Sequence, residues 1–259
     1  MSHINDHGWL DSRVSIIMPA YKAESIIGES IQSVVNQTYH DWELLVTNDM
    51  SPDNTAEVVQ EWVSRDARIR LINAPLNGGP ASARNLSLAQ AQGRWIAFLD
   101  SDDLWLPQKL ERQLAFHRDA SCIISYTEFR RITADGALTG HLLQVPDCVN
   151  YAGLLKGNVI ANSTALVDRS KTGPFSLRKM YCDDHGCWLS LLKDGGLACG
   201  LHEDLMRYRV MSNSVSRNKF RAAKETWKTY REMEKLPLLS SVYYFLHYAL
   251  RAGLKYRQF

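Results

Sequence analysis

The sequence lacks the features that mark membrane-spanning, secreted or disulfide-stabilised proteins. Its 259 residues contain no apolar run of about 18 residues, so no transmembrane helix is predicted. The first residues, MSHINDHGWLDSR, have no apolar core, and we therefore expect no signal peptide. The five cysteines are an odd number in a chain for which no signal peptide is expected, which favours reduced thiols in a cytoplasmic protein.

Net charge is also small, at +2, but it is unevenly distributed along the chain. From Lys219 to Phe259 nine Lys and Arg accompany three Glu, a net +6 that leaves −4 for the preceding 218 residues. This asymmetry predicts an anionic partner for the basic tail. Nucleic acid is not the expected partner, because the basic residues do not form a face with interleaved aromatic side chains.

The two standard glycine-rich phosphate cradles are missing as well. The chain contains no Gly-x-x-x-x-Gly-Lys loop, and no Gly-x-Gly-x-x-Gly follows the first apolar run. The first half nevertheless alternates apolar runs with segments of helical spacing. Strands are predicted at 14–21, 43–48, 69–73 and 94–100. This alternation indicates a Rossmann-like, mostly parallel α/β sheet with helices on both faces.

The rhythm changes after about residue 120. The predicted elements there are a strand pair turning at Asp135–Gly136, a strand over 158–168, a helix over 184–193, a strand over 205–210, and a helical segment 221–259 broken near Pro237. The C-terminal part is thus a helical extension of the sheet domain.

The stretch AFLDSDDLW, residues 97–105, places Asp100, Asp102 and Asp103 at the end of a predicted buried strand. Carboxylates this close repel one another. They either form an ordinary turn, which aspartate favours, or surround a cation. In an open parallel sheet, ligands bind beyond the carboxyl ends of the strands. A divalent cation there could join a carboxylate to a pyrophosphate, so we expect Mn²⁺ or Mg²⁺.

Three segments now resemble the nucleotide-binding half of family 2 glycosyltransferases with the GT-A fold. They are VSIIMPAYKAESIIGESIQSVVNQTYHDWELLVTND, NGGPASARN and GRWIAFLDSDDLWLPQKLERQ. The resemblance is to bacterial enzymes that build teichuronic acid, capsule or O-antigen (lipopolysaccharide) chains, and YRVMSNSVSRNK and TWKTYREMEKL resemble their C-terminal part. The resemblance implies a short N-terminal extension (1–12), a GT-A domain (13–215) and a helical tail (216–259). Within the GT-A domain it implies a nucleotide-binding half (13–104) and an acceptor-binding half (105–215).

The resemblance also implies roles for residues of the first half. Asp49 resembles the carboxylate that reads the uracil edge, and Arg84 resembles an arginine near the base and phosphates. Along the nucleotide pocket the resemblance places Pro19, Ala20 and Glu24. The chain departs from the family pattern at two positions, with Asn48 where a second acidic residue is usual and Lys22 where asparagine is usual.

The stretch DSDD corresponds to the Asp-x-Asp motif of the family. Asp102 would then be the direct metal ligand, and Asp100 would contact the ribose or the metal. From the residues themselves, Asp103 is expected to cap the loop rather than bind metal.

The catalytic base is expected in the second half, where YCDDHGCWLSLLK resembles the acidic motif of the family. Trp188 sets the register and makes Asp184 the candidate base, with Asp183 as the neighbouring alternative. Such a base must lie within hydrogen-bonding reach of the acceptor hydroxyl. Either aspartate could instead stabilise a helix start, and Trp188 is expected to pack in the core.

The predicted activity is inverting transfer of a sugar from a UDP-sugar to an undecaprenyl-diphosphate-linked glycan acceptor in cell-surface polysaccharide synthesis. The alternatives are a nucleotidyltransferase on the same fold and an inactive nucleotide-sugar-binding module. The tail, with Arg251, Lys255 and Arg257, forms either a packed helix or an interfacial helix on anionic lipid. The second possibility would make the protein peripheral on the inner face of the plasma membrane.

Overall fold

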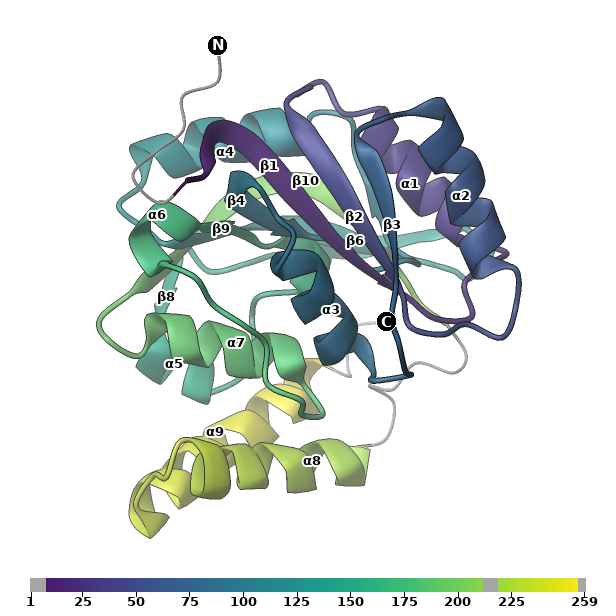
Figure 1. Cartoon of the computed structure of the whole chain (residues 1–259). Helices are drawn as coiled ribbons and strands as arrows, with labels where there is room; N and C mark the ends of the chain where they lie inside the picture. Colours follow the sequence, from purple (N-terminus) through teal and green to yellow (C-terminus); the bar gives the residue numbers. More distant parts are fainter. Residues whose placement is uncertain (1–7, 212–218, 256–259) are drawn as a thin grey trace.

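One mixed sheet runs through the centre of the computed structural model, which describes residues 8–211 and 219–255 (Figure 1). Its strands follow the order β3-β2-β1-β4-β9-β6-β10-β5, with β7 beside β6 and β8 beside β10. The four strands of the first half pair in parallel, as predicted: β1 (Leu10–Ala20), β2 (Trp42–Asn48), β3 (Ile69–Asn73) and β4 (Gly93–Phe98). The chain runs outward from β1 to β3 and then crosses to β4, so the strand order reverses beside β1, where ligands bind in such sheets.

Helices cover both faces of the sheet, also as predicted. On one face lie α1 (Ile27–Val35), α2 (Thr55–Arg65) and α4 (Lys109–Asp119), whose apolar residues join one buried cluster. On the other face lie α3 (Pro80–Leu88), α5 (Tyr151–Leu155) and α7 (Asp183–Leu192), which share a second cluster with the sheet. The buried, largely apolar centres of β1 and β2 follow from this double coverage.

The second half adds antiparallel pairs and some departures from the prediction. The turn at Asp135–Gly136 joins β6 (Ile124–Ile132) to β7 (Thr139–Leu143), as expected. The strand predicted at 205–210 is the end of a longer β10 (Leu197–Arg209), which pairs with β5 (Leu104–Trp105) and β8 (Cys148–Asn150).

The strand predicted over 158–168 is largely wrong. Only β9 (Leu166–Asp168) is extended, and a 3₁₀ turn, Asn162–Thr164, precedes it. Asparagine, serine and threonine bond to nearby backbone and so favour turns, which explains the error. After β9 comes the short helix α6 (Arg169–Thr172).

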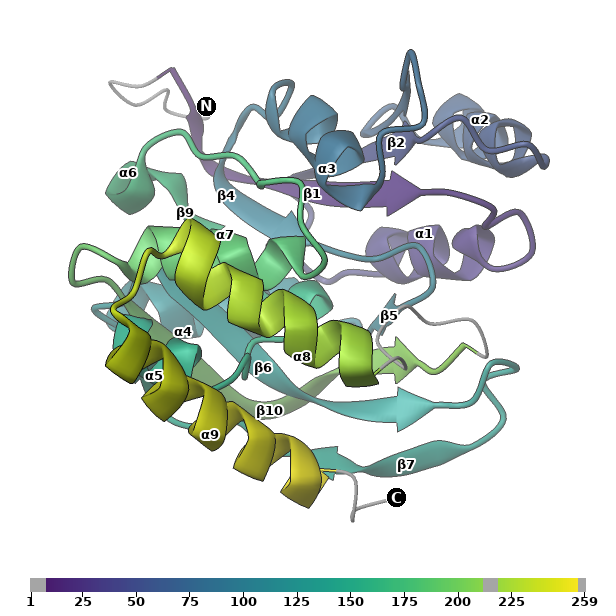
Figure 2. The same cartoon turned by 90° about the horizontal axis from the view of Figure 1, so that it is seen from below.

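The tail forms a helical hairpin that lies below α5 and α7 in the view of Figure 1 and in front of them in Figure 2. It consists of α8 (Lys219–Lys228), a π-helical turn (Thr229–Met233) and α9 (Leu238–Lys255), so the break near Pro237 is confirmed. Tyr230 anchors it by donating to the Leu155 carbonyl at 2.5 Å. Among the described helices, none has the length and apolarity required to cross a membrane. The expected domain boundary at 215/216 and Arg257 lie outside the described residues.

Candidate active site

Arg84 on α3 joins the two halves of the candidate site. Its guanidinium donates to Asp100 at 2.6 Å and to Asp183 at 2.5 Å, although Asp183 lies 99 residues further along the chain. Asp100 follows β4, and Asp183 begins α7. Burial alone would lower the pKa of Arg84, but the two carboxylates outweigh it and raise that pKa. The buried guanidinium therefore remains charged and fixes three elements relative to one another.

Asp49, directly after β2, builds the loop that leads into α3. Its two carboxylate oxygens accept the backbone N–H groups of Gly78 and Gly79, each at 2.8 Å. Gly79 has φ +82°, and a Cβ on Gly78 would come within 2.6 Å of the Ser82 side chain, so both positions require glycine. Asp49 thus positions Arg84 indirectly. Its expected contact with uracil stays a prediction, for which each oxygen still has a free lone pair.

The remaining residues predicted for the nucleotide pocket lie at the same edge. Pro19 and Ala20 end β1, and Glu24 follows in the next loop, where its carboxylate accepts the Asn54 N–H at 2.9 Å. Lys22 has φ +52°, in the left-handed region that asparagine tolerates better than lysine. Asn48, the other departure from the family pattern, donates to Asn73 at 3.0 Å and so ties the ends of β2 and β3 together.

Besides Asp100, the acidic loop after β4 contains Asp102 and Asp103, which differ in their hydrogen bonds. Asp103 is buried and accepts from the Ser163 hydroxyl at 2.5 Å and the Arg209 N–H at 3.0 Å, so its carboxylate ties this loop to the 3₁₀ turn and to β10 rather than capping the loop itself. Burial, followed by the charge of Asp102, raises the pKa of Asp103. The Asp102 carboxylate makes no hydrogen bond or ion pair with another residue of the described chain. Burial, followed by the charge of Asp100, raises the pKa of Asp102 to about 6.

Asp102 has the properties expected of a ligand to a cation. Within residues 8–211 and 219–255, no three His, Cys, Asp or Glu side chains converge as a preformed metal site. A cation here would take its other ligands from substrate phosphate and water, as Mg²⁺ usually does. The unpaired carboxylate fits this arrangement, because a positive charge would relieve the repulsion that raises its pKa.

Asp184 lies in the first turn of α7, next to the paired Asp183. Its half-buried carboxylate accepts from the Asn158 side chain at 3.1 Å. Burial, and then the charge of Asp183, raise the pKa of Asp184 to about 6. Such a pKa suits a general base near neutral pH. Trp188, one helical turn on, is fully buried edge-on against Phe98 at 5.4 Å, which confirms its packing role and fixes α7 on β4.

Sequence reasoning missed four residues that support these aspartates. Asn162 donates to Asp100 at 2.8 Å, and Ser163 donates to Asp103. Asn158 donates to Asp184, while Arg209 donates to the Asp102 carbonyl at 2.9 Å. The turn-forming asparagine and serine residues of 158–164 were the available signal, and they were misinterpreted as part of a strand.

Comparison with known proteins decides the family. Residues 15–185 match the model described as Glycosyl transferase family 2. The chain belongs to this family. It is therefore a glycosyltransferase.

Two curated relatives are similar to this glycosyltransferase along nearly its whole length. The putative teichuronic acid biosynthesis glycosyltransferase TuaG of Bacillus subtilis (strain 168) is 39% identical over 243 residues, covering 93% of this chain and 96% of TuaG. WfgD of Escherichia coli is 39% identical over 252 residues, covering 96% of each chain. WfgD is named as a UDP-Glc:alpha-D-GlcNAc-diphosphoundecaprenol beta-1,3-glucosyltransferase.

Solved structures establish the GT-A fold. Residues 1–349 of S. aureus TarS, in complex with UDP-GlcNAc, superpose with a TM-score of 0.70 at 16% identity, covering 92% of this chain and 71% of that one. The mannosyltransferase PcManGT of Pyrobaculum calidifontis, in complex with GDP-Man and Mn²⁺, gives 0.70 at 17% identity, covering 94% and 75%. At such identities the likeness shows the fold alone.

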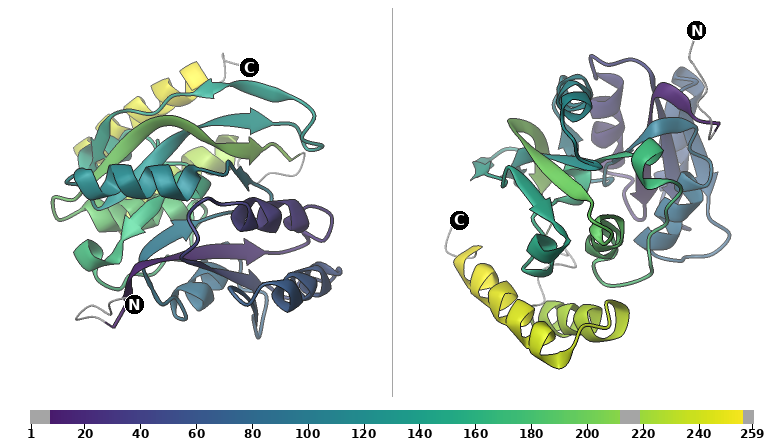
Figure 3. Two further views of the ribbon diagram at one scale, coloured as in Figure 1. Left: turned by 90° about the horizontal axis from the view of Figure 1, so that it is seen from above. Right: turned by 90° about the vertical axis from the view of Figure 1, so that its left-hand side faces the viewer.

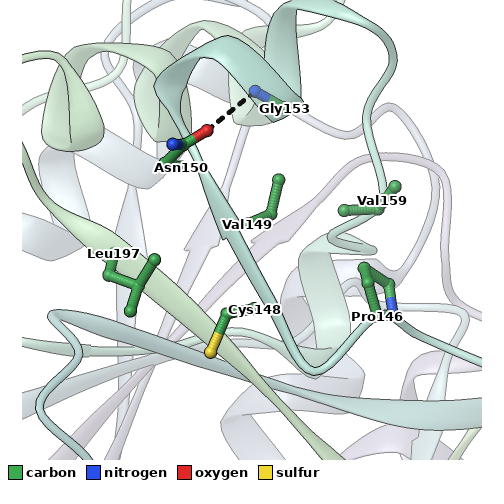
Figure 4. A pocket seen from close by; sticks show the side chains of 7 residues that line it. All are labelled: Pro146, Cys148, Val149, Asn150, Gly153, Val159 and Leu197. Carbon is green, nitrogen blue, oxygen red and sulfur yellow. Dashed lines mark hydrogen bonds between the residues drawn. The ribbon is translucent and has the colours of Figure 1, made fainter.

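Two cavities of the glycosyltransferase lie apart from these aspartates. Figure 4 shows one of about 490 Å³, walled by β8 and the start of α5 and lined by residues such as Cys148 and Leu197. Cys148 faces Cys199 across β8 and β10, with the two free thiol sulfurs 2.9 Å apart. A second, of about 600 Å³, is lined by α7 and the segment before it. No predicted site residue lines either of these two cavities.

Proposed function

We propose that this glycosyltransferase moves one sugar, with inversion, from a UDP-sugar to an undecaprenyl-diphosphate-linked glycan in cell-surface polysaccharide synthesis. The observation that carries the proposal is geometric: Arg84 pairs with Asp100 and Asp183, while Asp102 and Asp184 form no ion pair among the described residues and have pKa values raised by burial. The names of TuaG and WfgD support the polysaccharide and the lipid-linked acceptor. The UDP-GlcNAc complex of TarS supports a UDP-sugar donor.

In this proposal Asp184 is the general base. Its carboxylate takes the proton of the acceptor hydroxyl while the hydroxyl oxygen attacks the anomeric carbon from the face opposite UDP. The carbon–oxygen bond to UDP breaks, and UDP leaves with the bonding electron pair. Asp183 is the weaker candidate, because its carboxylate already accepts from the buried Arg84.

The donor is held at the strand-end loops in this scheme. Asp102 would hold Mn²⁺ or Mg²⁺, which when bound offsets the charge of the departing diphosphate. Asp100 would contact the ribose or the metal, and Asp49 the uracil. Pro19, Ala20 and Glu24 would line the nucleotide pocket from the loop after β1.

The test is a donor and acceptor screen. The purified protein is incubated with Mn²⁺, a panel of UDP-, GDP- and dTDP-sugars, and a short-chain lipid diphosphate bearing one sugar. We expect release of UDP, and a product whose new anomeric configuration is inverted, as read by NMR. Pyrophosphate release instead of UDP would indicate nucleotidyl transfer. Full activity in EDTA, or retention of configuration, would refute the metal or the inverting step respectively.

A further inference from the structure

Helix α9 presents an apolar stripe to solvent. Its members recur at intervals of three and four residues, which places them on one helical face. They are Leu239, Val242, Tyr243, Leu246 and Leu250. Leu239 is 84% exposed and Leu250 is 67% exposed, although leucine is usually among the most buried residue types. We call these five residues the α9 stripe.

The exposure of the stripe does not come from a loosely attached helix. The opposite face of α9 is packed, with Ser241 fully buried and Phe245 edge-on against Trp227 of α8 at 5.5 Å. Tyr244 contacts the anchored Tyr230 at 6.3 Å between ring centres. The hairpin forms an outer layer of the molecule, on the far side of α5 and α7 from the sheet (Figures 2 and 3). The fold therefore holds the stripe outward.

The segment that carries the stripe is basic in sequence. From Lys235 to Phe259 the sequence contains four Lys and Arg and no Asp or Glu. Lys156, just after α5, lies with its ammonium group 5.9 Å from the ring centre of Tyr243. An apolar helical stripe in a basic setting is the composition of helices that lie in the plane of an anionic membrane surface. Lys and Arg near such a surface add attraction of about 1 kcal/mol each.

We propose that the α9 stripe is the face by which the enzyme lies on an anionic lipid bilayer. The proposal deepens the proposed function and rests on it for its purpose, because a lipid-linked acceptor is available only at a membrane. A second copy of the chain fits the stripe less well. Stable protein interfaces use about 20–30 residues a side, whereas the stripe offers five. Two copies would also bring two basic, acid-free segments together.

The test compares two single substitutions of exposed leucines. Leu246→Glu removes an apolar contact from the stripe, and Leu138→Glu makes the same change in the turn between β6 and β7. The full chain is co-sedimented with vesicles of phosphatidylcholine, with and without phosphatidylglycerol. We expect binding that requires phosphatidylglycerol. We also expect Leu246→Glu to lower the partition coefficient about tenfold or more, from lost burial and added repulsion, and Leu138→Glu to leave it unchanged.

Several outcomes would overturn the proposal. They are absence of binding by the wild type at low salt, equal binding to neutral vesicles, and equal loss in both variants. A dimer in solution that Leu246→Glu converts to a monomer would assign the stripe to a second copy instead.

A parallel assay separates this proposal from the proposed function. Sugar transfer to a water-soluble, short-chain acceptor should be the same for the wild type and Leu246→Glu. Transfer to a long-chain acceptor embedded in the vesicles should fall with binding. Absence of transfer to either acceptor, with vesicle binding intact, would refute the proposed function and leave the membrane face standing.

Discussion

Replacing Asp184 with asparagine should raise stability while it removes turnover. The carboxylate is half-buried beside Asp183, and burial followed by that charge raises the pKa of Asp184 from 3.8 to about 6. Folding therefore opposes the charged form of this side chain at neutral pH. Asparagine has the same shape without the charge, so Asp184→Asn removes the penalty. A residue kept at such a cost is expected to serve function.

The size of the stability gain follows from the rise in the pKa of Asp184. A rise of about two pKa units, at about 1.36 kcal/mol each, sets an upper limit of about 3 kcal/mol. Partial solvent contact and the hydrogen bond from Asn158 reduce it, so we expect Asp184→Asn to gain about 1–2 kcal/mol. Because the folded-state pKa is the higher one, the wild type loses this stability as pH rises through about 6. The gain should therefore vanish near pH 4 and be complete above about pH 7.

Urea denaturation at low and at neutral pH measures the gain, and UDP release measures turnover. We expect turnover to fall about 100-fold or more with donor affinity little changed. Asp183→Asn is the matched control, since it leaves the buried Arg84 guanidinium partly unpaired and should cost about 3 kcal/mol. Destabilisation by both substitutions would refute the penalty on the Asp184 charge, and retained turnover in Asp184→Asn would refute its assignment as base.

Three further predictions follow from the same region. Asp102→Asn should leave the melting temperature unchanged or higher, because the carboxylate lacks a partner among the described residues, yet it should abolish Mn²⁺-dependent transfer. Normal transfer activity of the variant in a Mn²⁺ titration would contradict this. Lys22→Asn should raise stability by about 0.5 kcal/mol, since asparagine adopts φ +52° more readily, and a lower urea midpoint would contradict this. Turnover should fall about tenfold per pH unit below pH 6 as Asp184 is protonated, and a flat acidic limb would exclude that base.

The sequence predicted the first half of the fold well because its signals are local. Each strand from β1 to β4 contains a mostly apolar stretch of strand length, and β3 has the predicted bounds of 69–73. The segment 158–168 failed because apolar residues and turn formers alternate in it, and its 3₁₀ turn is held by tertiary contacts. Ser163, for example, donates to Asp103, which is 60 residues away. Such a contact leaves no periodicity in the sequence.

The sequence predicted which residues lie at the candidate site, but not which of them contact one another. The rule that ligands bind beyond the carboxyl ends of strands gathered Asp49, Arg84 and Asp100 at one edge. Nothing in the spacing indicated that Asp49 would bind the Gly78–Gly79 turn, or that Arg84 would reach Asp183. Both contacts depend on where α3 and α7 pack on the sheet, and that placement is decided by distant core residues such as Trp188 and Phe98.

The ion pairs and hydrogen bonds of the site distinguish the carboxylates that support the fold from those proposed to react. Arg84 is a single buried cation shared by Asp100 and Asp183, and Asp103 is satisfied by Ser163 and the backbone of Arg209. Asp102 and Asp184 each keep a pKa of about 6. These are the two positions to which the proposed reaction brings positive charge, a divalent cation at one and the hydroxyl proton at the other. Burial also raises the pKa of Asp103, but its carboxylate already accepts from Ser163 and the Arg209 N–H, so Asp102 and Asp184 remain the two carboxylates that the proposed chemistry would neutralise. Removing either of their charges should therefore relieve the fold and stop the reaction.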